Sequence, residues 1–282
     1  MNTETKQQIK ADLANYVSKI GSANKARVRL GVSGATISNI LNGKWENMAD
    51  SLWLGIHKQV LQSDWIHSDT SVSKKLMRLY ADAKENAEVR GATANAGRGK
   101  THTAKLFVSE NDNSFLVSCD QTMKIGDFLA EMLRAIGKQK AGLSNYEALN
   151  FLCEELLGLK NPFFIIDEFD KLKDIVKFLF ISIYNRTEGC VSFFIQGAPY
   201  LKKSLDTLAK KDKQGAKEII DRLNGKIIDL GDNTAADLAG IALINGINDP
   251  ERCTYLVNDS DYSLRRLKSS VKVELRRRKE AV

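Results

Sequence analysis

The sequence predicts an α/β fold with a parallel sheet, preceded by a small all-α domain. Short apolar runs alternate with helical stretches between residues 88 and 230. Strands alternating with helices are typical of a parallel sheet that is covered by helices on both faces. Residues 234–275 show helical periodicity without a strand signal, so a small helical lid is expected after the sheet. The first 62 residues carry a separate helical pattern.

The length of 282 residues permits a small domain and one of about 200 residues, which is large enough to bury a core. We expect four segments along the chain. They are an N-terminal helical domain at residues 1–62, a polar linker at 63–73, the α/β core at 74–232, and the lid with a basic C-terminus at 233–282.

A phosphate-binding loop is predicted between the first strand and the first helix of the core. Residues 94–101 fit the pattern G-x-x-x-x-G-K-[ST], except that Ala94 replaces the first glycine. In such a loop Lys100 reaches the β- and γ-phosphates of ATP, and Thr101 gives its hydroxyl to Mg²⁺. The simpler alternative is a glycine-rich turn with a chance lysine. The nucleotide-binding residues expected here are Asn95, Ala96, Gly97, Arg98, Gly99, Lys100, Thr101 and His102.

Two adjacent carboxylates end the apolar run at residues 163–166, which has the character of a strand buried on both faces. At a strand end they would meet the phosphates and the metal. We expect Asp167 to hold the water shell of Mg²⁺ and Glu168 to orient and deprotonate the attacking water. An acidic pair is otherwise common as the solvated start of a loop, but its position after a phosphate loop favours catalysis.

Three more polar residues follow in the order expected of an AAA+ module, an order that distinguishes this class from kinases and small GTPases. Gln196 ends another apolar strand, where it would sense the γ-phosphate or be a plain strand-end residue. Arg222 ends an amphipathic helix and would reach a neighbouring subunit's nucleotide as an arginine finger; the alternative is a solvated charge. Arg265 lies in the last helical region, where a nucleotide-sensing arginine is expected.

The N-terminal domain has the spacing of a helix-turn-helix at residues 24–43. Gly31 permits a left-handed turn residue, and Ser33 is expected to cap the next helix. That helix would expose Ala35, Thr36, Ser38 and Asn39, of which Thr36, Ser38 and Asn39 are the candidate DNA-binding side chains. A three-helix protein-interaction domain is the alternative interpretation.

The net charge of +7 and the isoelectric point near 9.1 suit a polyanionic partner. The C-terminus is the most basic segment, either as the soluble end of a helix or as a contact for DNA or a transposase. Its cations are Arg265, Arg266, Lys268, Lys272, Arg276, Arg277, Arg278 and Lys279.

The four cysteines have no metal-like spacing and are expected to be reduced and buried, which favours a cytoplasmic protein. No apolar run approaches the roughly 18 residues of a membrane span, and the N-terminus is polar, so neither membrane insertion nor export is expected.

A helix-turn-helix joined to a minimal AAA+ module resembles the family of the phage Mu B transposition protein along nearly the whole chain. The likeness rests on residues 36–38, 97–101, 165–172, 221–223 and 263–267. This chain departs from the family pattern at Ala94, at Ala198 where relatives carry a polar sensor, and at Tyr262, which replaces a glycine.

The resemblance implies a mechanism. ATP-bound subunits would form a helical filament on double-stranded DNA with little sequence preference, recruit and stimulate a DDE transposase, and disassemble on hydrolysis. Arg222 would complete the site of the neighbouring subunit. The candidates for the DNA-facing surface of this homo-oligomer are Lys124, Lys138 and Lys140.

Two other functions remain open. One is a DNA-binding regulator that uses ATP only as an oligomerisation switch and binds one operator tightly. The other is a replication ATPase of the helicase-loader type, which the helix-turn-helix and the early C-terminus disfavour. A neighbouring gene for an integrase-like transposase would support the transposition hypothesis, whereas a divergent promoter with a palindrome would support the regulator.

Overall fold

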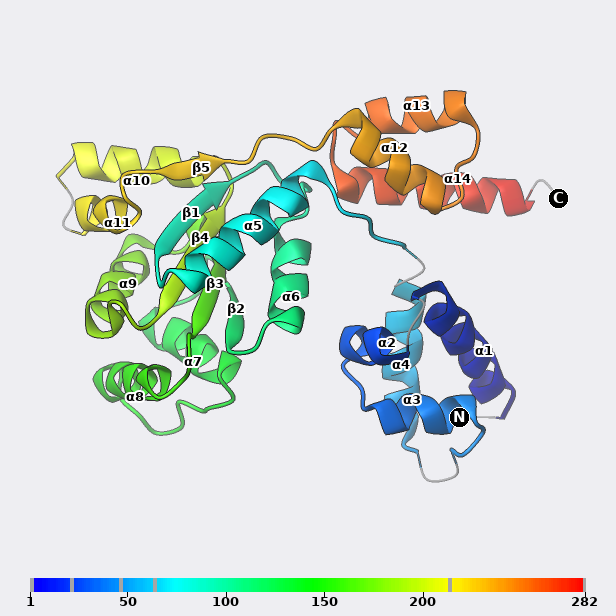
Figure 1. The fold of residues 1–282 in the computed structure, drawn as a ribbon, viewed down its shortest axis with the longest axis horizontal. Helices are drawn as coiled ribbons and strands as arrows, with labels where there is room; N and C mark the ends of the chain where they lie inside the picture. Colours follow the sequence, from blue (N-terminus) through cyan, green and yellow to red (C-terminus); the bar gives the residue numbers. More distant parts are fainter. Residues whose placement is uncertain (1–2, 21–22, 46–47, 63–64, 213–214, 281–282) are drawn as a thin grey trace. The chain divides into compact units, whose positions relative to one another are not determined.

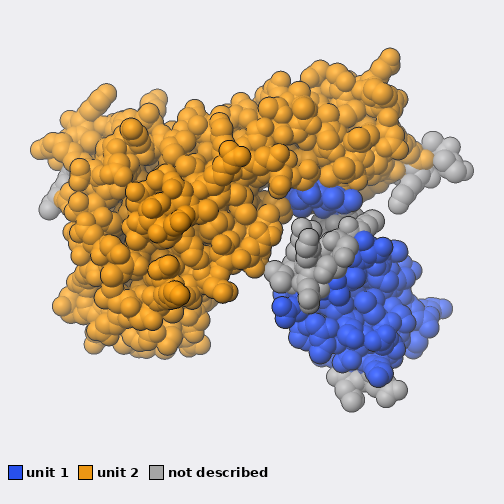
Figure 2. Space-filling model, in the orientation of Figure 1, with its two compact units in different colours: residues 1–67 blue, residues 68–282 orange. Residues whose placement is uncertain are grey.

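A computed structural model describes residues 3–20, 23–45, 48–62, 65–212 and 215–280 (Figure 1). The chain divides into two compact units, Met1–His67 and Ser68–Val282, which Figure 2 shows in blue and orange. No helix in these ranges is both long and apolar enough to cross a membrane.

In the described part of the first unit, the regular secondary structure is all helical. Its core is formed by buried apolar side chains that include Leu13, Ala26, Ile37 and Trp53. Ala26 of α2 is fully buried. Four helices build this unit: α1 (Thr3–Ile20), α2 (Ala23–Leu30), α3 (Gly34–Leu41) and α4 (Asp50–Gln62).

The turn between α2 and α3 has the local chemistry that the sequence pattern predicts. Gly31 has a φ of +60°, a left-handed conformation that favours glycine. The Ser33 hydroxyl caps α3 by accepting a hydrogen bond from the backbone N–H of Thr36 at 3.0 Å. The side chains of Ile37 and Ile40 are buried, so α3 turns its polar side chains outward.

The second unit contains a parallel five-stranded sheet in the order β2-β3-β4-β1-β5. Its strands are β1 (Val89–Thr93), β2 (Ser114–Ser118), β3 (Phe163–Asp167), β4 (Ser192–Gly197) and β5 (Ile227–Asp229). Between and around the strands lie α5 (Ser71–Glu85), α6 (Lys100–Glu110), α7 (Ile125–Ala135), α8 (Asn145–Leu157), the 3₁₀ turn η1 (Phe169–Lys171), α9 (Asp174–Thr187), α10 (Tyr200–Lys210) and α11 (Ala216–Arg222).

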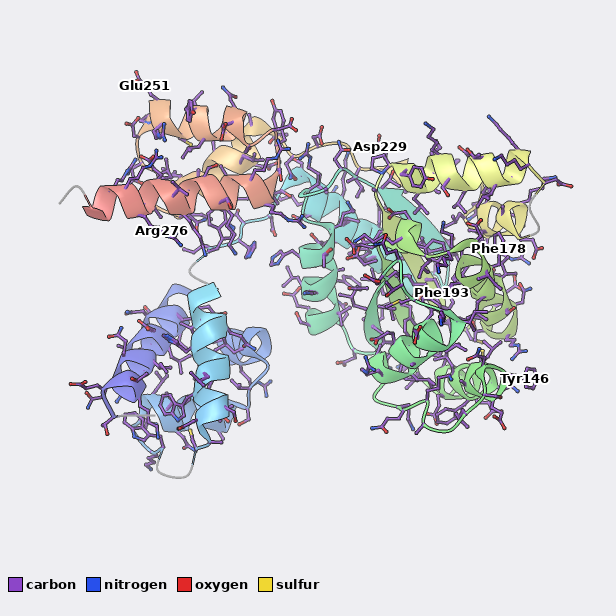
Figure 3. All side chains as sticks on the ribbon, turned by 180° about the vertical axis from the view of Figure 1, so that it is seen from behind. Tyr146, Phe178, Phe193, Asp229, Glu251 and Arg276 are labelled. Carbon is purple, nitrogen blue, oxygen red and sulfur yellow. The ribbon has the colours of Figure 1, made fainter. Side chains whose placement is uncertain are left out.

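Each face of the sheet packs on its own set of helices because successive strand residues point to opposite faces. Phe164 and Phe193 belong to the apolar cluster with α7, α8 and α9. Phe163 and Phe194 belong to the cluster with α5 and α6. Figure 3 shows Phe193 inside the body of the core, while Tyr146 on α8 lies at its rim. The prediction of a parallel sheet with helices on both faces is therefore confirmed.

A small lid follows the sheet and is helical in its described residues: α12 (Ala235–Ile244), α13 (Pro250–Asp259) and α14 (Leu264–Glu280). Leu238, Ile241, Leu256, Leu267 and Val271 are its buried side chains. The backbone N–H of Ser71 at the start of α5 donates to Asp237 Oδ2 of α12 at 3.0 Å, which joins the lid to the core.

Two local expectations differ from the structure. The predicted linker at 63–73 overlaps α5, which begins at Ser71 because Thr70 and Ser73 form a reciprocal capping box; residues 63 and 64 of that linker lie outside the described residues. The expectation that all four cysteines are buried was wrong for Cys190, which is exposed in the turn before β4, and Cys253 is only half-buried.

Candidate nucleotide-binding site

The predicted phosphate loop joins the end of β1 to the start of α6, so the N-terminus of a helix faces the carboxyl edge of the sheet. Gly97 and Gly99 have φ values of +79° and +95°, which only glycine adopts readily. Ala94 is 1% exposed, lies in the apolar cluster below α5 and α6, and does not have a positive φ. The replacement of the first glycine by alanine therefore costs the loop no backbone strain.

The side chain of Lys100 folds back onto the first residues of the phosphate loop. Its Nζ atom donates hydrogen bonds to the carbonyl oxygens of Ala94 at 2.6 Å and Asn95 at 3.1 Å. Burial lowers the pKa of Lys100, while the nearby carboxylates of Asp167, Asp170 and Glu168 oppose that shift. A lysine held by two carbonyls inside a phosphate loop is ready to exchange those partners for phosphate oxygens.

Asp167 lies at the centre of the site. Its Oδ2 atom accepts a hydrogen bond from Thr101 Oγ1 at 2.5 Å. Its Oδ1 atom accepts from Gln196 Nε2 at 2.9 Å and from the backbone N–H of Glu168 at 3.0 Å. The structure thus brings together the loop threonine, the first strand-end acid and the polar end of β4, three residues that are far apart in the sequence.

Glu168 leaves the strand in an unusual conformation. Its φ is +57°, in the left-handed region that is rare for a residue with a side chain. The carboxylate is 43% exposed, and its Oε2 accepts a hydrogen bond from Lys171 Nζ at 2.6 Å. That bond raises the pKa of Lys171. The turn points the second acid away from the core and toward solvent, where a water molecule can reach it.

Gln196 is fully buried, unlike a side chain that projects toward the γ-phosphate. Both ends of its amide bind within the protein, because Nε2 donates to Asp167 and Oε1 accepts from the Tyr80 hydroxyl at 2.5 Å. In this conformation the predicted sensor residue therefore contacts the metal-site acid.

The lid and the segment after β5 close over the phosphate loop. The backbone N–H of Leu264 donates to the carbonyl oxygen of Gly97 at 2.9 Å, and a Cβ atom on Gly97 would lie 2.1 Å from Ser263 Oγ. Arg98 is buried, and its Nε donates to Asp232 Oδ1 at 2.5 Å. Its side chain thus binds the segment after β5, which leaves its backbone to serve the phosphate site.

The other predicted nucleotide-site residues lie at the rim. Asn95 is exposed and donates to Asp232 Oδ1 at 3.4 Å. Ala96 and His102 are exposed on the loop and on the first turn of α6. Arg265 is exposed next to Leu264, so the lid contact brings its backbone near the loop.

Arg222 is held by α9. Its guanidinium lies over the Tyr184 ring at 5.0 Å, and Nη2 donates to Asn185 Oδ1 at 3.2 Å. Its Nε atom is buried without a hydrogen-bond partner among the described residues. These contacts hold the arginine at the end of α11 and do not bring it to the phosphate loop of its own chain.

The predicted DNA-facing residues belong to both units. On α3, Ser38 and Asn39 are exposed, whereas Thr36 is half-buried and hydrogen-bonded to Ser33 at 2.8 Å between the two hydroxyl oxygens. Two of the lysines have partners within the second unit. Lys138 pairs with Glu155 at 3.0 Å, and Lys140 donates to the carbonyl oxygen of Leu143 at 3.0 Å, while Lys124 is exposed at the start of α7.

Three residues that the sequence did not single out contribute to the site. Tyr80 binds Gln196, Asp232 binds Arg98, and Asp170 Oδ1 accepts from the backbone N–H of Ala198 at 3.0 Å. Asp170 follows the acidic pair by two residues, and this position in the sequence could have marked it as part of the site. Tyr80 and Asp232 lie outside the motifs, so only the packed fold reveals them.

The oxygen atoms of Thr101 and Asp167 are the kind of ligands that Mg²⁺ prefers. Within the described part of the chain, no group of three or more His, Cys, Asp or Glu side chains forms a metal site. A hard cation that keeps several waters and binds through one carboxylate, one hydroxyl and nucleotide phosphates fits this donor set.

Comparisons with known proteins agree with this geometry. A family model described as an AAA domain matches residues 86–205, a segment that contains the phosphate loop, the acidic pair and β4. No curated protein sequence matches the chain. The matched segment and the sheet order define the core as an AAA+ P-loop fold and support nucleotide binding and hydrolysis.

One solved structure is similar at the level of the fold. The chain is similar to a chain in the structure of Drosophila ORC bound to DNA, with a TM-score of 0.53 and 12% identity over 77% of this chain and 58% of that chain. The structure of Drosophila ORC bound to AT-rich DNA and Cdc6 aligns with a TM-score of 0.42 and 12% identity, over 57% of this chain and 56% of that chain. This chain therefore spans less than two thirds of either chain.

Proposed function

We propose that this protein is a Mg²⁺-dependent ATPase that assembles with ATP on duplex DNA and selects target DNA for a DDE transposase. The observation that carries the ATPase is the contact of Asp167 with both Thr101 and Gln196 beneath the phosphate loop. The resemblance to the Mu B family and the helix-turn-helix pattern at the N-terminus support the role in transposition.

Different residues of the site would bind phosphate, hold the metal and accept the proton. Lys100 would leave the carbonyls of Ala94 and Asn95 for phosphate oxygens when nucleotide enters. Thr101 and Asp167 would hold Mg²⁺, which neutralises charge on the β- and γ-phosphate oxygens when bound. Glu168, turned out of the strand by its positive φ, would accept a proton from the attacking water.

A neighbouring subunit would supply the remaining positive charge. Arg222 ends α11 and packs against Tyr184 of α9 in its own chain, with an exposed partner in Asp221 at 3.4 Å. An arginine finger acts by stabilising charge on the transferred phosphoryl group in the transition state. Fast hydrolysis would then require an assembled oligomer, which couples turnover to filament formation.

DNA binding would be largely independent of sequence. Phosphate contacts dominate such binding and release counterions, so the affinity falls steeply with salt. The exposed polar face of α3 and the basic balance of the chain are the features that supply these contacts.

A regulator that binds one operator is the second candidate, favoured by the exposed Ser38 and Asn39 on α3, where base contacts would be made. The replication alternative is compatible with the likeness to Drosophila ORC, which at 12% identity is a likeness of fold.

Competition binding separates these functions. Labelled random-sequence duplex is bound with ATP, and unlabelled duplexes of unrelated sequence compete. The transposition proposal expects equal competition by all of them, and an affinity whose logarithm falls with log salt by about 0.9 per phosphate contacted. One duplex that competes far better than the others would favour the regulator instead.

A further inference from the structure

A chain of hydrogen bonds runs from α5 into the metal site. The Tyr80 hydroxyl donates to Gln196 Oε1 at 2.5 Å, Gln196 Nε2 donates to Asp167 Oδ1 at 2.9 Å, and Thr101 donates to Asp167 Oδ2 at 2.5 Å. Tyr80 and Gln196 are both fully buried. These hydrogen bonds therefore connect α5, a helix that carries no nucleotide-binding motif, to the acid that would hold Mg²⁺.

The fold explains why these residues meet. Asp167 lies at an odd position of β3 with Phe163 and Ile165, on the face that packs against α5 and α6. Gln196 lies two residues after Phe194 on β4, so it points to the same face. The inner side of α5 packs on this face, which places the Tyr80 hydroxyl beside Gln196.

Gln196 is a neutral amide with one donor end and one acceptor end. If its carbonyl end faced the carboxylate of Asp167, the two oxygens would repel each other. A donor on the far side is needed to hold Oε1 away from the acid, and Tyr80 is placed to supply it. Burial, together with the charge of Asp167, raises the pKa of Tyr80 well above its usual range, so the hydroxyl keeps its proton.

We propose that Tyr80 is a positioning residue of the metal site, which orients the Gln196 amide so that Nε2 holds Asp167 in place for Mg²⁺. This role rests on the proposed ATPase function. Such outer partners fix the orientation of metal ligands and tune their affinity. Tyr80 is itself held by aromatic contacts, with ring centroids 4.7 Å from Phe194 and 5.3 Å from Phe107.

The test is the Tyr80→Phe variant, which keeps the ring and removes the donor. Mg²⁺ is titrated with a fluorescent, non-hydrolysable ATP analogue, and the same titration follows ATP hydrolysis. We expect the Mg²⁺ concentration at half-saturation to rise about threefold to tenfold in both assays, since one buried hydrogen bond of the outer shell is lost. Binding of the analogue without Mg²⁺ should not change.

Two further variants separate positioning from packing. Phe163→Leu removes a ring 6.1 Å from that of Tyr80 and keeps the hydroxyl, so it should lower the melting temperature without a shift in Mg²⁺ dependence. Gln196→Leu removes the link itself. If Tyr80 acts through Gln196, adding Tyr80→Phe to Gln196→Leu should raise the required Mg²⁺ no further.

The outcomes distinguish this role from the function on which it rests. Wild-type protein that hydrolyses no ATP at saturating Mg²⁺, even with duplex DNA present, would overturn the ATPase proposal. An active wild type with an unshifted Tyr80→Phe variant would overturn the role of Tyr80, as would an equal shift in the Gln196→Leu background. If Tyr80→Phe did not fold, a double variant that needs more Mg²⁺ than Gln196→Leu would overturn the role, because Tyr80 would then act on the site without Gln196.

Discussion

Glu168 shows how a single backbone angle can separate two adjacent acids. Asp167 ends β3 and is buried, whereas the positive φ at Glu168 turns the next carboxylate out to solvent. Non-glycine residues in this region are uncommon and are enriched at functional sites. The pair therefore divides into one acid suited to hold a metal and one suited to activate water.

Glu168→Gln tests that division. The amide is isosteric but cannot accept a proton, so hydrolysis should fall about 10²- to 10⁴-fold while ATP binding persists. The lifetime of the protein on DNA should lengthen, because disassembly would await hydrolysis. Nucleotide binding and DNA dissociation rates measure both effects. Loss of DNA binding in this variant would contradict the role assigned to Glu168.

Arg222→Ala should lower the rate of DNA-stimulated hydrolysis about 10³-fold or more if Arg222 is an arginine finger. Nucleotide binding by single subunits should remain intact. A mixing experiment tests whether it acts between subunits. Arg222→Ala subunits retain Glu168, and Glu168→Gln subunits retain Arg222, so their mixed interfaces should regain part of the activity. A mixture that stays inactive, or an Arg222→Ala protein with unaltered turnover, would remove Arg222 from the neighbouring site.

Among the elements, α3 is the helix on which a substitution of an exposed residue tests whether the N-terminal unit contacts DNA or another protein. Asn39→Glu in the full chain places a negative charge on its outer face, so affinity for random duplex should fall about fivefold or more through repulsion of phosphates. Asn15→Glu, on the exposed side of α1, is the matched control for the added charge. Equal affinities of the two variants in a titration would show that α3 does not contact DNA.

The elements that could be predicted from the sequence are those with a local signal. Consecutive residues carry the signals for β3, β4 and the loop before α6. The strands are recognisable from unbroken apolar runs, and the loop from its glycine and lysine spacing. The cap at Ser33 and the turn at Gly31 belong to the same kind of signal.

Contacts across the fold could not be predicted in this way. The Tyr80 hydroxyl meets Gln196 only because α5 packs on the face of β4 to which position 196 points. Asp232 binds Arg98 from a distance of 134 residues along the chain. The sensor role of Gln196 was predicted only from its position at a strand end. The orientation of its buried amide depends on Tyr80, which belongs to no motif.

At the scale of the whole molecule, the chain consists of a helical unit, Met1–His67, and a unit with the AAA+ fold, Ser68–Val282. The core brings the proposed metal ligands Thr101 and Asp167 together, whereas Arg222 packs against α9 of its own chain. A subunit with this arrangement is expected to hydrolyse ATP slowly alone and faster in an assembly. DNA that aligns many subunits would then stimulate turnover.

The most direct test measures the ATPase rate against added random-sequence duplex DNA and images the same samples by negative-stain microscopy. The proposed function predicts a rate that rises with DNA, together with filaments that require ATP and are lost after hydrolysis. A flat rate without filaments, combined with tight binding to one particular sequence, would contradict it.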